Sequence, residues 1–293
     1  MFLKRKLLSD CMSKTILLAD SGATKTEWKF IRGKKELPSF KTAGISPYHM
    51  SGAVIENLIR KEFSKKNLEA AVDLIYYYGT GCKTAKNAKI VHKALSHVFP
   101  HAKIHVTHDL MGAAIALCGN EHGVACILGT GSNSCSFNGK RIIKNSPGLG
   151  YVLGDEGSGF YLGKKVIQHY LYGTFDDMLM HLFEVQFKTT KDEILARVYK
   201  ETFANRYLAG FCRFLSANRG HYMIENIIED GLRDFFEIHL KSYPQAKTEP
   251  VHFVGSIAYH FKDKIWELCN SYGFQLGRIL KAPMKGLAKY HIN

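Results

Sequence analysis

Hydrophobic residues along the chain recur with two different spacings, and the alternation between these spacings predicts an α/β protein. Near the beginning, alternating apolar and polar positions predict strands at residues 15–20, 26–31 and about 36–41, joined by short turns. Apolar residues at helical spacing follow and predict a helix over about residues 51–66. Together these elements indicate a β-meander that leads into a helix.

The α/β alternation continues to about residue 118. A buried strand is expected at 73–78, a helix at 85–98, a strand at 103–107 and a short alanine-rich helix at 109–118. Strands that alternate with helices in this way are typical of a sheet covered by helices. We therefore expect a first domain over residues 14–118.

A second domain is expected over residues 119–279. Its predicted elements are a hairpin at 125–137, a strand at 141–144, a helical insert at 158–240, a strand at 251–254, a helix at 256–272 and a last strand at 273–277. No linker rich in Pro, Gly or Ser separates the two parts of the chain. We therefore expect the two domains to form one hinged body.

The charge of the chain raises the question of nucleic-acid binding. The 293 residues include 40 Lys and Arg against 26 Asp and Glu, which gives a formal net charge of +14. The basic residues are scattered in short pairs and accompany no known reader motif, so a basic surface that attracts polyanionic ATP is favoured over a nucleic-acid partner. No apolar run is long enough to span a bilayer, so no membrane partner is expected either.

Cysteine usage points to the cytoplasm. The chain has seven cysteines, an odd number, and no C-x-x-C pair, which favours buried thiols in a reducing compartment. The spacing argues against an iron–sulfur cluster held by clustered thiolates, although a cluster shared across a dimer interface could use isolated cysteines. The 14 histidines show no metal-binding spacing. The basic first eleven residues lack the apolar core of a signal peptide and are excluded from the fold prediction.

The turn between the first two expected strands carries the most distinctive chemistry. Asp20 ends the first apolar run, and small residues, hydroxyls and Lys25 follow. Such a tip offers backbone N–H groups and an ammonium group to a phosphate chain, while Asp20 can hold Mg²⁺ through water. The turn leads into a strand, so it is not the P-loop that precedes a helix. An ordinary hairpin with a polar turn is the alternative.

A second copy of this pattern appears about a hundred residues later. The apolar run at 125–128 is followed by a small, hydroxyl-rich turn at 129–134 and then by a return strand. Setting Gly22 against Gly131 aligns the apolar runs, the turns and the aromatic positions. The repeat suggests a duplicated domain that grips one nucleotide from both sides.

Four segments of the sequence resemble one known family. Residues 20–26 resemble the first phosphate motif of the sugar kinase, Hsp70 and actin superfamily, and within it they are most similar to the N-acetylglucosamine kinase and BadF/BadG/BcrA/BcrD ATPase family. Residues 129–133 resemble its second phosphate motif, 148–158 its most distinctive segment, and 253–258 its adenosine motif. The resemblance runs from about residue 15 to the C-terminus.

The resemblance implies a fold and a set of nucleotide contacts. The fold is α/β, with two ribonuclease-H-like (actin-like ATPase) domains, a helical insertion in the second, and a C-terminal helix within 280–293 that packs on the first. The residues implied to bind ATP are Gly22, Ala23, Thr24, Lys25, Thr26, Gly129, Thr130, Gly131, Ser132, Gly255 and Ser256. Ala23 stands where the family commonly has Gly, and it would be strained at positive φ. A solvated Lys25 and a simple N-cap at Ser256 are the alternatives at those positions.

The resemblance also implies a sugar site. The residues placed there are Ser46, Asn133, Gly148, Gly150, Asp155 and Glu156. Carboxylates accept hydrogen bonds from hydroxyls, and glycines allow close approach of the backbone. Two departures affect this site, because Ser46 replaces a common Asn and Leu149 a common Trp. A solvated acidic loop is the alternative for Asp155 and Glu156.

Asp109 is implied to be the catalytic base. Phosphoryl transfer to a hydroxyl needs a carboxylate that takes the proton, and Asp109 follows the strand at 103–107 at the start of a helix. A plain helix N-cap is the alternative, since Asp is a favoured cap residue.

These inferences predict an ATP-dependent, Mg²⁺-requiring cytoplasmic kinase. It would phosphorylate a hydroxyl of a small sugar, N-acetylglucosamine or another amino sugar, and its two domains would close over the substrates and exclude water. Two other functions stay open. One is an ATPase that activates a partner enzyme, as BadF/BcrA-type proteins do, and the other is a sugar-sensing protein without catalysis. A homodimer also stays open.

Overall fold

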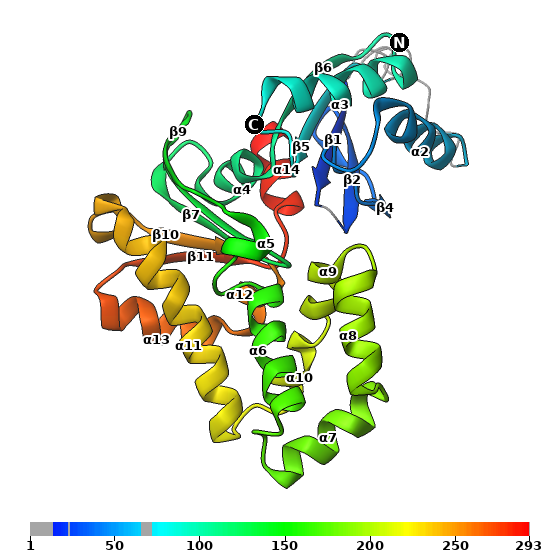
Figure 1. Ribbon diagram of the computed structural model, residues 1–293. Coiled ribbons are helices and arrows are strands. Elements are labelled where there is room, and N and C mark those ends of the chain that lie inside the picture. Colours follow the sequence, from blue (N-terminus) through cyan, green and yellow to red (C-terminus); the bar gives the residue numbers. More distant parts are fainter. Residues whose placement is uncertain (1–13, 23, 66–71, 293) are drawn as a thin grey trace. The chain divides into compact units, whose positions relative to one another are not determined.

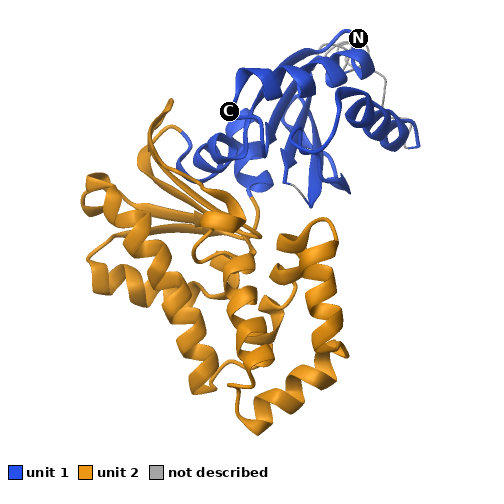
Figure 2. Cartoon of the chain, viewed as in Figure 1, with its two compact units in different colours: residues 1–119, 283–293 blue, residues 120–282 orange. Residues whose placement is uncertain are grey.

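The structure is a computed structural model that describes residues 14–22, 24–65 and 72–292. The described residues form two compact units (Figure 2). Unit 1 comprises those within 1–119 and 283–293, and unit 2 comprises those within 120–282. Each unit is described by itself below.

Unit 1 is built on a sheet in the strand order β3-β2-β1-β5-β6, with β4 also paired to β2. Its strands are β1 (Thr15–Ser21), β2 (Lys25–Arg32), β3 (Lys35–Glu36), β4 (Phe40–Ala43), β5 (Leu74–Gly79) and β6 (Lys103–His108). Its helices are α2 (Gly52–Ser64), α3 (Ala85–Val98), α4 (Asp109–Cys118) and α14 (Met284–Ile292). β1 pairs antiparallel with β2 and parallel with β5, and β5 pairs parallel with β6.

Helices cover both faces of this sheet because its strands are apolar on both sides. Leu17 and Ala19 of β1 belong to the buried cluster formed with α2 and α3. Leu18, between them in sequence, belongs to a second cluster with residues of α4 and α14, since side chains alternate across a strand. Figure 1 shows α14 beside α4, so the C-terminal helix packs on unit 1.

The third expected strand, at 36–41, is two separate strands in the structure. β3 pairs with the end of β2 and β4 pairs with its beginning, with the break between Glu36 and Phe40. Pro38 lies in the break and has no N–H to donate to a ladder, which explains the interruption.

Unit 2 repeats the sheet topology of unit 1. Its strands are β7 (His122–Leu128), β8 (Ser132–Asn138), β9 (Ile142–Ser146), β10 (Val251–Val254) and β11 (Leu276–Leu280), in the order β9-β8-β7-β10-β11. As in unit 1, two antiparallel pairings precede two parallel ones. This repetition confirms the predicted fold class of two actin-like domains.

A helical layer packs against the unit 2 sheet. Its helices are α5 (Gly150–Leu153), α6 (Gly159–Tyr172), α7 (Asp177–Phe187), α8 (Lys191–Lys200), α9 (Ala204–Ala209), α10 (Cys212–Ala217), α11 (Tyr222–Ile238), α12 (Ser256–His260) and α13 (Lys262–Tyr272), with short 3₁₀ turns η1 (Leu240–Ser242) and η2 (Pro244–Lys247). One buried cluster joins strand residues such as Val124 and Phe253 to α6, α10, α11 and α13.

Two boundaries in unit 2 differ from the prediction. The helix expected at 256–272 is divided at Phe261, whose backbone (φ −111°, ψ 33°) leaves the helical region. The last strand begins at Leu276 instead of residue 273, because Gly273 adopts the left-handed conformation that ends α13.

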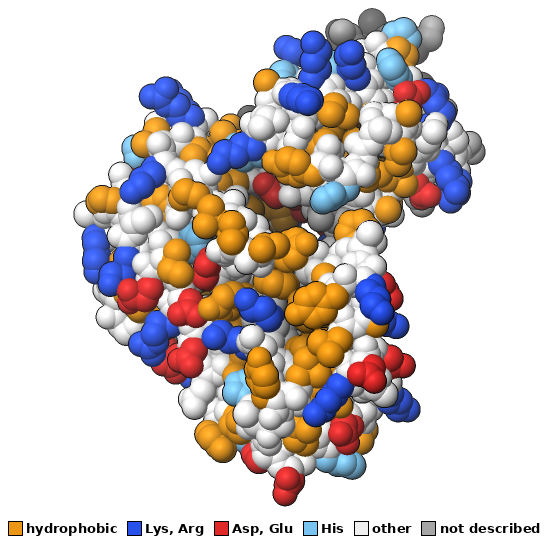
Figure 3. All heavy atoms as spheres, viewed as in Figure 1, with side chains coloured by type: hydrophobic (Ala, Val, Ile, Leu, Met, Phe, Trp, Pro, Cys, Tyr) orange, Lys and Arg blue, Asp and Glu red, His pale blue; other side chains and the backbone are white. Residues whose placement is uncertain are grey.

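Charge is not concentrated on the visible face of either unit. In Figure 3, Lys and Arg side chains are spread over both units, and acidic side chains lie among them. Within the described residues, no helix has the length and apolar character required to cross a lipid bilayer.

Candidate functional site

The first phosphate-type turn is a tight hairpin at the end of β1. Ser21 pairs with Thr26 across the hairpin, and their hydroxyl oxygens lie 2.7 Å apart. The N–H of Gly22 donates to the carbonyl of Lys25 at 3.0 Å and closes the turn. Thr24 and Lys25 are exposed at the tip, whereas the Thr26 hydroxyl is buried against Ser21. Ala23 lies outside the described residues.

The sheet topology brings Asp20 and Asp109 to the same edge of unit 1. Gly79 of β5 is in register with Ser21 of β1 on one side and with His108 of β6 on the other. Asp20 and Asp109 adjoin these positions at the carboxyl ends of parallel strands, where ligands commonly bind in α/β sheets. The arrangement places two carboxylates at one edge of one sheet.

Burial makes both carboxyl groups unusually basic. Burial, together with the negative charges of Asp109 and Glu27, raises the pKa of Asp20 to about 7, and the charge of Lys25 opposes the rise. Burial also raises the pKa of Asp109, against hydrogen bonds from the Leu110 backbone and from Thr80. A carboxylate with a raised pKa is a better proton acceptor.

Asp109 does not act as the cap of α4. The N-cap residue is His108, which makes no side-chain cap hydrogen bond, and Asp109 is the first helical residue. Its Oδ1 accepts a hydrogen bond from the N–H of Leu110 at 2.8 Å. The helix-cap alternative therefore does not explain an aspartate at this position.

Tyr77 lies beside this carboxylate pair and was not among the sequence candidates. Its side chain is fully buried, and burial raises the pKa of its hydroxyl, with smaller contributions from Asp20 and Asp109. A Cβ atom at Gly79 would lie 2.2 Å from Cε1 of the Tyr77 ring, so the ring requires glycine there. In the sequence, the run of three tyrosines in β5 indicates only a buried strand, and the pattern does not distinguish Tyr77 from the other two.

The second phosphate-type turn is fixed to the start of α6. The N–H of Gly159 donates to the Gly129 carbonyl at 2.8 Å, and that of Phe160 donates to the Thr130 carbonyl at 3.0 Å. The hydroxyl of Ser132 is buried and has no hydrogen-bond partner among the described residues. A buried polar group is normally satisfied, so this hydroxyl suits a polar ligand at the turn.

Asp155 contacts the same turn. Its Oδ1 accepts a hydrogen bond from the N–H of Ser132 at 3.2 Å, and a Cβ atom at Gly131 would lie 2.8 Å from its Oδ2. Asp155 has a φ of 59°, a conformation that non-glycine residues adopt only where the surroundings enforce it. Burial raises the pKa of its carboxyl, and the Ser132 hydrogen bond opposes the rise.

Among the remaining unit 2 sugar candidates, Gly148 lies against Asn133. A Cβ atom at Gly148 would lie 3.5 Å from the side-chain amide of Asn133, and one at Gly154 would lie 3.5 Å from Oε2 of Glu156. Gly150 begins α5 at a φ of 74°. Oε2 of Glu156 also lies 2.9 Å from Nε2 of His239, a residue that was not among the sequence candidates.

Ser46 belongs to unit 1 and lies on the loop between β4 and α2. It is nearly buried, and its carbonyl accepts hydrogen bonds from His49 and Met50. The preceding carbonyl, that of Ile45, accepts a hydrogen bond from the Ser21 hydroxyl at 3.3 Å. Ser46 is therefore anchored next to the first hairpin.

The two adenosine candidates follow β10. A Cβ atom at Gly255 would lie 2.1 Å from the Leu128 carbonyl oxygen, and its φ is 130°, so only glycine fits. Gly255 is also the N-cap of α12, which makes Ser256 the first helical residue and not the cap.

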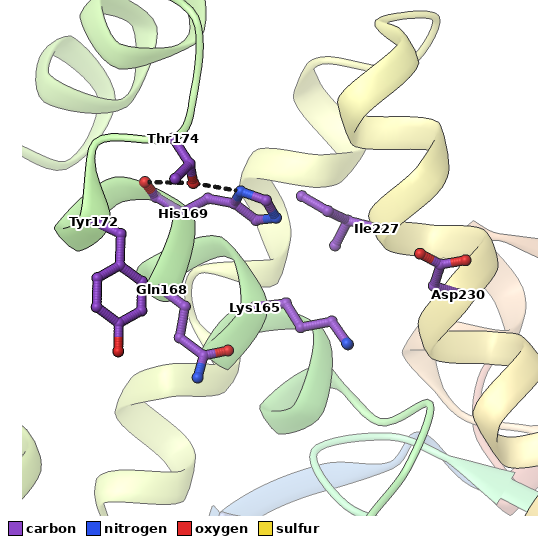
Figure 4. A pocket seen from close by; sticks show the side chains of 7 residues that line it. All are labelled: Lys165, Gln168, His169, Tyr172, Thr174, Ile227 and Asp230. Carbon is purple, nitrogen blue, oxygen red and sulfur yellow. Dashed lines mark hydrogen bonds between the residues drawn. The ribbon is translucent and has the colours of Figure 1, made fainter.

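A separate surface pocket of about 310 Å³ lies between α6 and α11. It is lined by Lys165, Gln168, His169, Tyr172, Thr174, Ile227 and Asp230 (Figure 4). His169 Nδ1 and Thr174 Oγ1 lie 2.8 Å apart on its wall. It contains none of the predicted site residues, so we do not assign the phosphate chemistry to it.

Comparisons with known proteins give close relatives. A Porphyromonas gingivalis protein described as a putative N-acetylglucosamine kinase has a crystal structure with a TM-score of 0.91 and 38% sequence identity, over 95% of this chain and 99% of that one. An N-acetyl-D-glucosamine kinase of Dictyostelium discoideum is 29% identical over 178 residues, and an N-acetylmuramic acid/N-acetylglucosamine kinase of Clostridium acetobutylicum is 25% identical over 244.

The matches differ in extent. The similarity spans 55% of this chain and 55% of the Dictyostelium enzyme, and 76% of this chain and 77% of the Clostridium enzyme. No family model matches the chain. The similarity to the Porphyromonas protein, by contrast, is high in sequence and nearly complete in both chains. The chain therefore belongs to the N-acetylglucosamine kinase family.

Proposed function

We propose that the protein transfers the γ-phosphoryl group of ATP to a hydroxyl of a small sugar, with N-acetylglucosamine or a related amino sugar as the acceptor. The observation that carries the proposal is the pair of basic carboxyl groups at one sheet edge, Asp20 and Asp109, next to a hairpin of the phosphate-binding type. Membership of the N-acetylglucosamine kinase family supports the choice of acceptor.

Asp109 is assigned as the base. As the sugar oxygen forms its bond to the γ-phosphorus, the hydroxyl proton passes to the Asp109 carboxylate, the bond from the γ-phosphorus to the bridging oxygen breaks, and ADP leaves. The raised pKa of Asp109 favours this proton transfer. The partly buried position of the group also limits competition from water.

Asp20 is assigned to Mg²⁺. Mg²⁺ in kinases is usually held by one or two carboxylates, by water and by the phosphates, and it neutralises charge on the transferring group. The donor chemistry fits, because Asp20 is buried near the Asp109 carboxylate and the charge of Lys25 offsets only part of the resulting rise in its pKa. Asp20 would hold the ion through water.

The nucleotide is assigned to both turns. The residues assigned in the unit 1 turn are Gly22, Ala23, Thr24, Lys25 and Thr26. Those assigned in the unit 2 turn are Gly129, Thr130, Gly131 and Ser132, and Gly255 and Ser256, which follow β10, are assigned to the adenosine. The exposed Lys25 and the buried, unpartnered Ser132 hydroxyl support polar ligand contacts at the two tips. Thr26 supports the first turn structurally, because its hydroxyl bonds to Ser21.

The sugar is assigned to Asn133, Gly148, Gly150, Asp155 and Glu156 of unit 2, with Ser46 of unit 1. Carboxylate oxygens accept hydrogen bonds from sugar hydroxyls, and a hydroxyl such as Ser46 can donate or accept one. Asp155 also touches the second phosphate turn through Ser132, which couples the sugar site to the nucleotide site within unit 2. Because ATP and Mg²⁺ are supplied in the cytoplasm, we place the reaction there.

The test is ADP release from Mg-ATP across a panel of sugars and amino sugars. The proposal predicts release that depends on one acceptor class and is negligible without it. Release that ignores the sugar would indicate an ATPase that acts on a partner protein. Sugar binding without any ADP release would indicate a sensor, and either result would overturn the kinase proposal.

A further inference from the structure

A histidine outside all four motifs lies against the proposed sugar site. His239 ends helix α11 and is only 3% exposed. Its Nε2 lies 2.9 Å from Oε2 of Glu156. We propose that His239 is a positioning residue that holds Glu156 in the orientation in which it receives a sugar hydroxyl. The inference rests on the proposed function.

The donors and acceptors of the pair define one arrangement. An ionised carboxylate only accepts hydrogen bonds, so the Nε2–H of His239 donates to Glu156. With the proton on Nε2, Nδ1 is left to accept the hydroxyl proton of Ser146, whose Oγ lies 2.9 Å away. Oε1 of Glu156 makes no hydrogen bond with any described residue, and it is the atom left for a ligand.

The imidazole ring is held by its surroundings. The Phe235 ring lies one turn earlier on α11, with its centroid 5.0 Å from that of His239. The His239 N–H donates to the Phe235 carbonyl, and the His239 carbonyl accepts the Ser242 hydroxyl at 2.7 Å. The backbone N–H and carbonyl of His239 and both ring nitrogens are therefore hydrogen-bonded. A buried ring held in this way can orient Glu156 with little loss of conformational freedom.

The same hydrogen-bond network continues to Asn133, another polar sugar candidate. The N–H of Ser146 donates to the Tyr243 hydroxyl, which donates to the Ser134 carbonyl at 2.9 Å. Asn145 Nδ2 donates to that carbonyl at 2.8 Å and to Oδ1 of Asn133 at 3.0 Å. β8, β9 and the end of α11 therefore share one polar network that ends at the sugar candidates Asn133 and Glu156.

His239 also gives Glu156 a hydrogen-bond donor that is separate from the donor of the adjacent carboxylate, Asp155. Asp155 and Glu156 are neighbours in sequence, and their negative charges repel each other. Asp155 is stabilised by the N–H of Ser132, and Glu156 by the imidazole of His239. Each carboxylate thus has its own donor, so both can remain acceptors for the sugar.

Two substitutions at this position separate orientation of Glu156 from packing. In His239→Asn the side-chain amide keeps a polar group near the Nδ1 position and loses the contact with Glu156. In His239→Gln the amide nitrogen lies near the Nε2 position and keeps a donor for Glu156. We expect His239→Asn to raise the sugar KM by about tenfold to a hundredfold, with the ATP KM within about threefold of wild type. His239→Gln should restore most of the sugar affinity.

The matched control is His181→Asn, the same change at an exposed position of α7. Wild-type ADP release, measured first, tests the proposed function by itself. If wild type is active and both His239 variants change the sugar KM equally, or change only the melting temperature, the positioning role is wrong while the kinase function stands.

A double substitution tests whether His239 acts through Glu156. Glu156→Ala alone should raise the sugar KM, and adding His239→Asn should raise it by less than about twofold more, because the side chain that His239 orients is no longer present. Independent, multiplying effects on KM would overturn the proposal. Thermal denaturation of each variant shows whether it is folded, and if His239→Asn fails to fold, His239→Ala takes its place in the double substitution.

Discussion

Burial controls the chemistry of the two aspartates at the edge of the unit 1 sheet. It raises the pKa of both carboxyl groups, and the charge of Asp109 adds to the effect at Asp20. The pKa of Asp20 is raised to about 7, so a proton competes with a cation for its carboxylate near neutral pH. In Asp109 the same cause produces a stronger proton acceptor.

Replacing Asp109 removes the acceptor without a change in size. We expect Asp109→Asn to lower turnover by roughly 10²–10⁴-fold. Its melting temperature should stay equal or rise, because a buried charge is removed. Steady-state ADP release and thermal denaturation measure the two effects, with Glu62→Gln on the surface of α2 as the control. A variant with near-wild-type turnover would remove Asp109 from the mechanism.

Gly131 leaves the space that the Asp155 carboxylate fills. A Cβ atom there would lie 2.8 Å from Asp155 Oδ2, so Gly131→Ala must displace that carboxylate from the Ser132 N–H. We expect a fall of about tenfold or more in kcat/KM for the sugar. Gly52→Ala, where a Cβ atom has ordinary contact distances, serves as the control. Equal kinetics for Gly131→Ala and wild type would show that Asp155 need not hold this position.

His252 makes the stability of unit 2 depend on pH. Its Nδ1 accepts a hydrogen bond from the Arg278 N–H at 2.8 Å, and burial, aided by the charge of Arg278, lowers its pKa from 6.5 to about 4. Between these pH values the unfolded chain binds more protons than the folded one. The free energy of unfolding therefore falls as the pH falls through this window.

His252→Asn keeps an acceptor near the Nδ1 position and does not titrate. We expect its free energy of unfolding to fall less steeply than that of wild type between about pH 6.5 and pH 4. Urea denaturation at several pH values gives the slopes, and part of the slope should remain because the pKa of His291 is also lowered to about 4. Parallel slopes in the two proteins would contradict the assignment.

At the scale of elements, hydrophobic spacing predicted the strands and helices that pack directly on a sheet. The hairpins, α2, α3 and α4 lie where the periodicity places them, because their apolar faces are buried. The predicted ends of strands and helices were wrong where a single residue interrupts the backbone pattern, as at Pro38, Phe261 and Gly273. Some side-chain contacts between distant segments were not predicted. Nothing near His239 in sequence indicates that its ring meets Glu156, and Tyr77 is indistinguishable from its tyrosine neighbours.

Close helix packing in unit 2 depends on a glycine in α6. A Cβ atom at Gly163 would lie 2.0 Å from the backbone oxygen of Leu208 in α9, whereas one at Gly231 in α11 would lie 2.4 Å from the end of the Leu162 side chain. Side-chain ends can move and backbone atoms here cannot. We expect Gly163→Ala to lower the melting temperature clearly more than Gly231→Ala, whose cost is partly offset by the higher helix propensity of alanine. The reverse order in thermal denaturation would contradict the packing described.

At the scale of the molecule, the chain uses one sheet topology twice. Each unit has a hairpin, a third antiparallel strand and two parallel strands in the same order. The chain leaves unit 1 after residue 119 and returns to it at residue 283, so unit 1 is completed only by the last helix. The proposal assigns the base and the Mg²⁺ carboxylate to unit 1 and most sugar contacts to unit 2. Its central claim is the transfer of the γ-phosphoryl group of ATP to a hydroxyl of an amino sugar.

The most direct measurement of that claim is the fate of the phosphoryl group. The protein is incubated with Mg-ATP and N-acetylglucosamine, and the phosphorus-containing products are followed by phosphorus NMR alongside ADP. The proposed function predicts one sugar phosphate for each ADP, with little inorganic phosphate. ADP matched by inorganic phosphate, with no sugar phosphate formed from this or any other amino sugar, would contradict it.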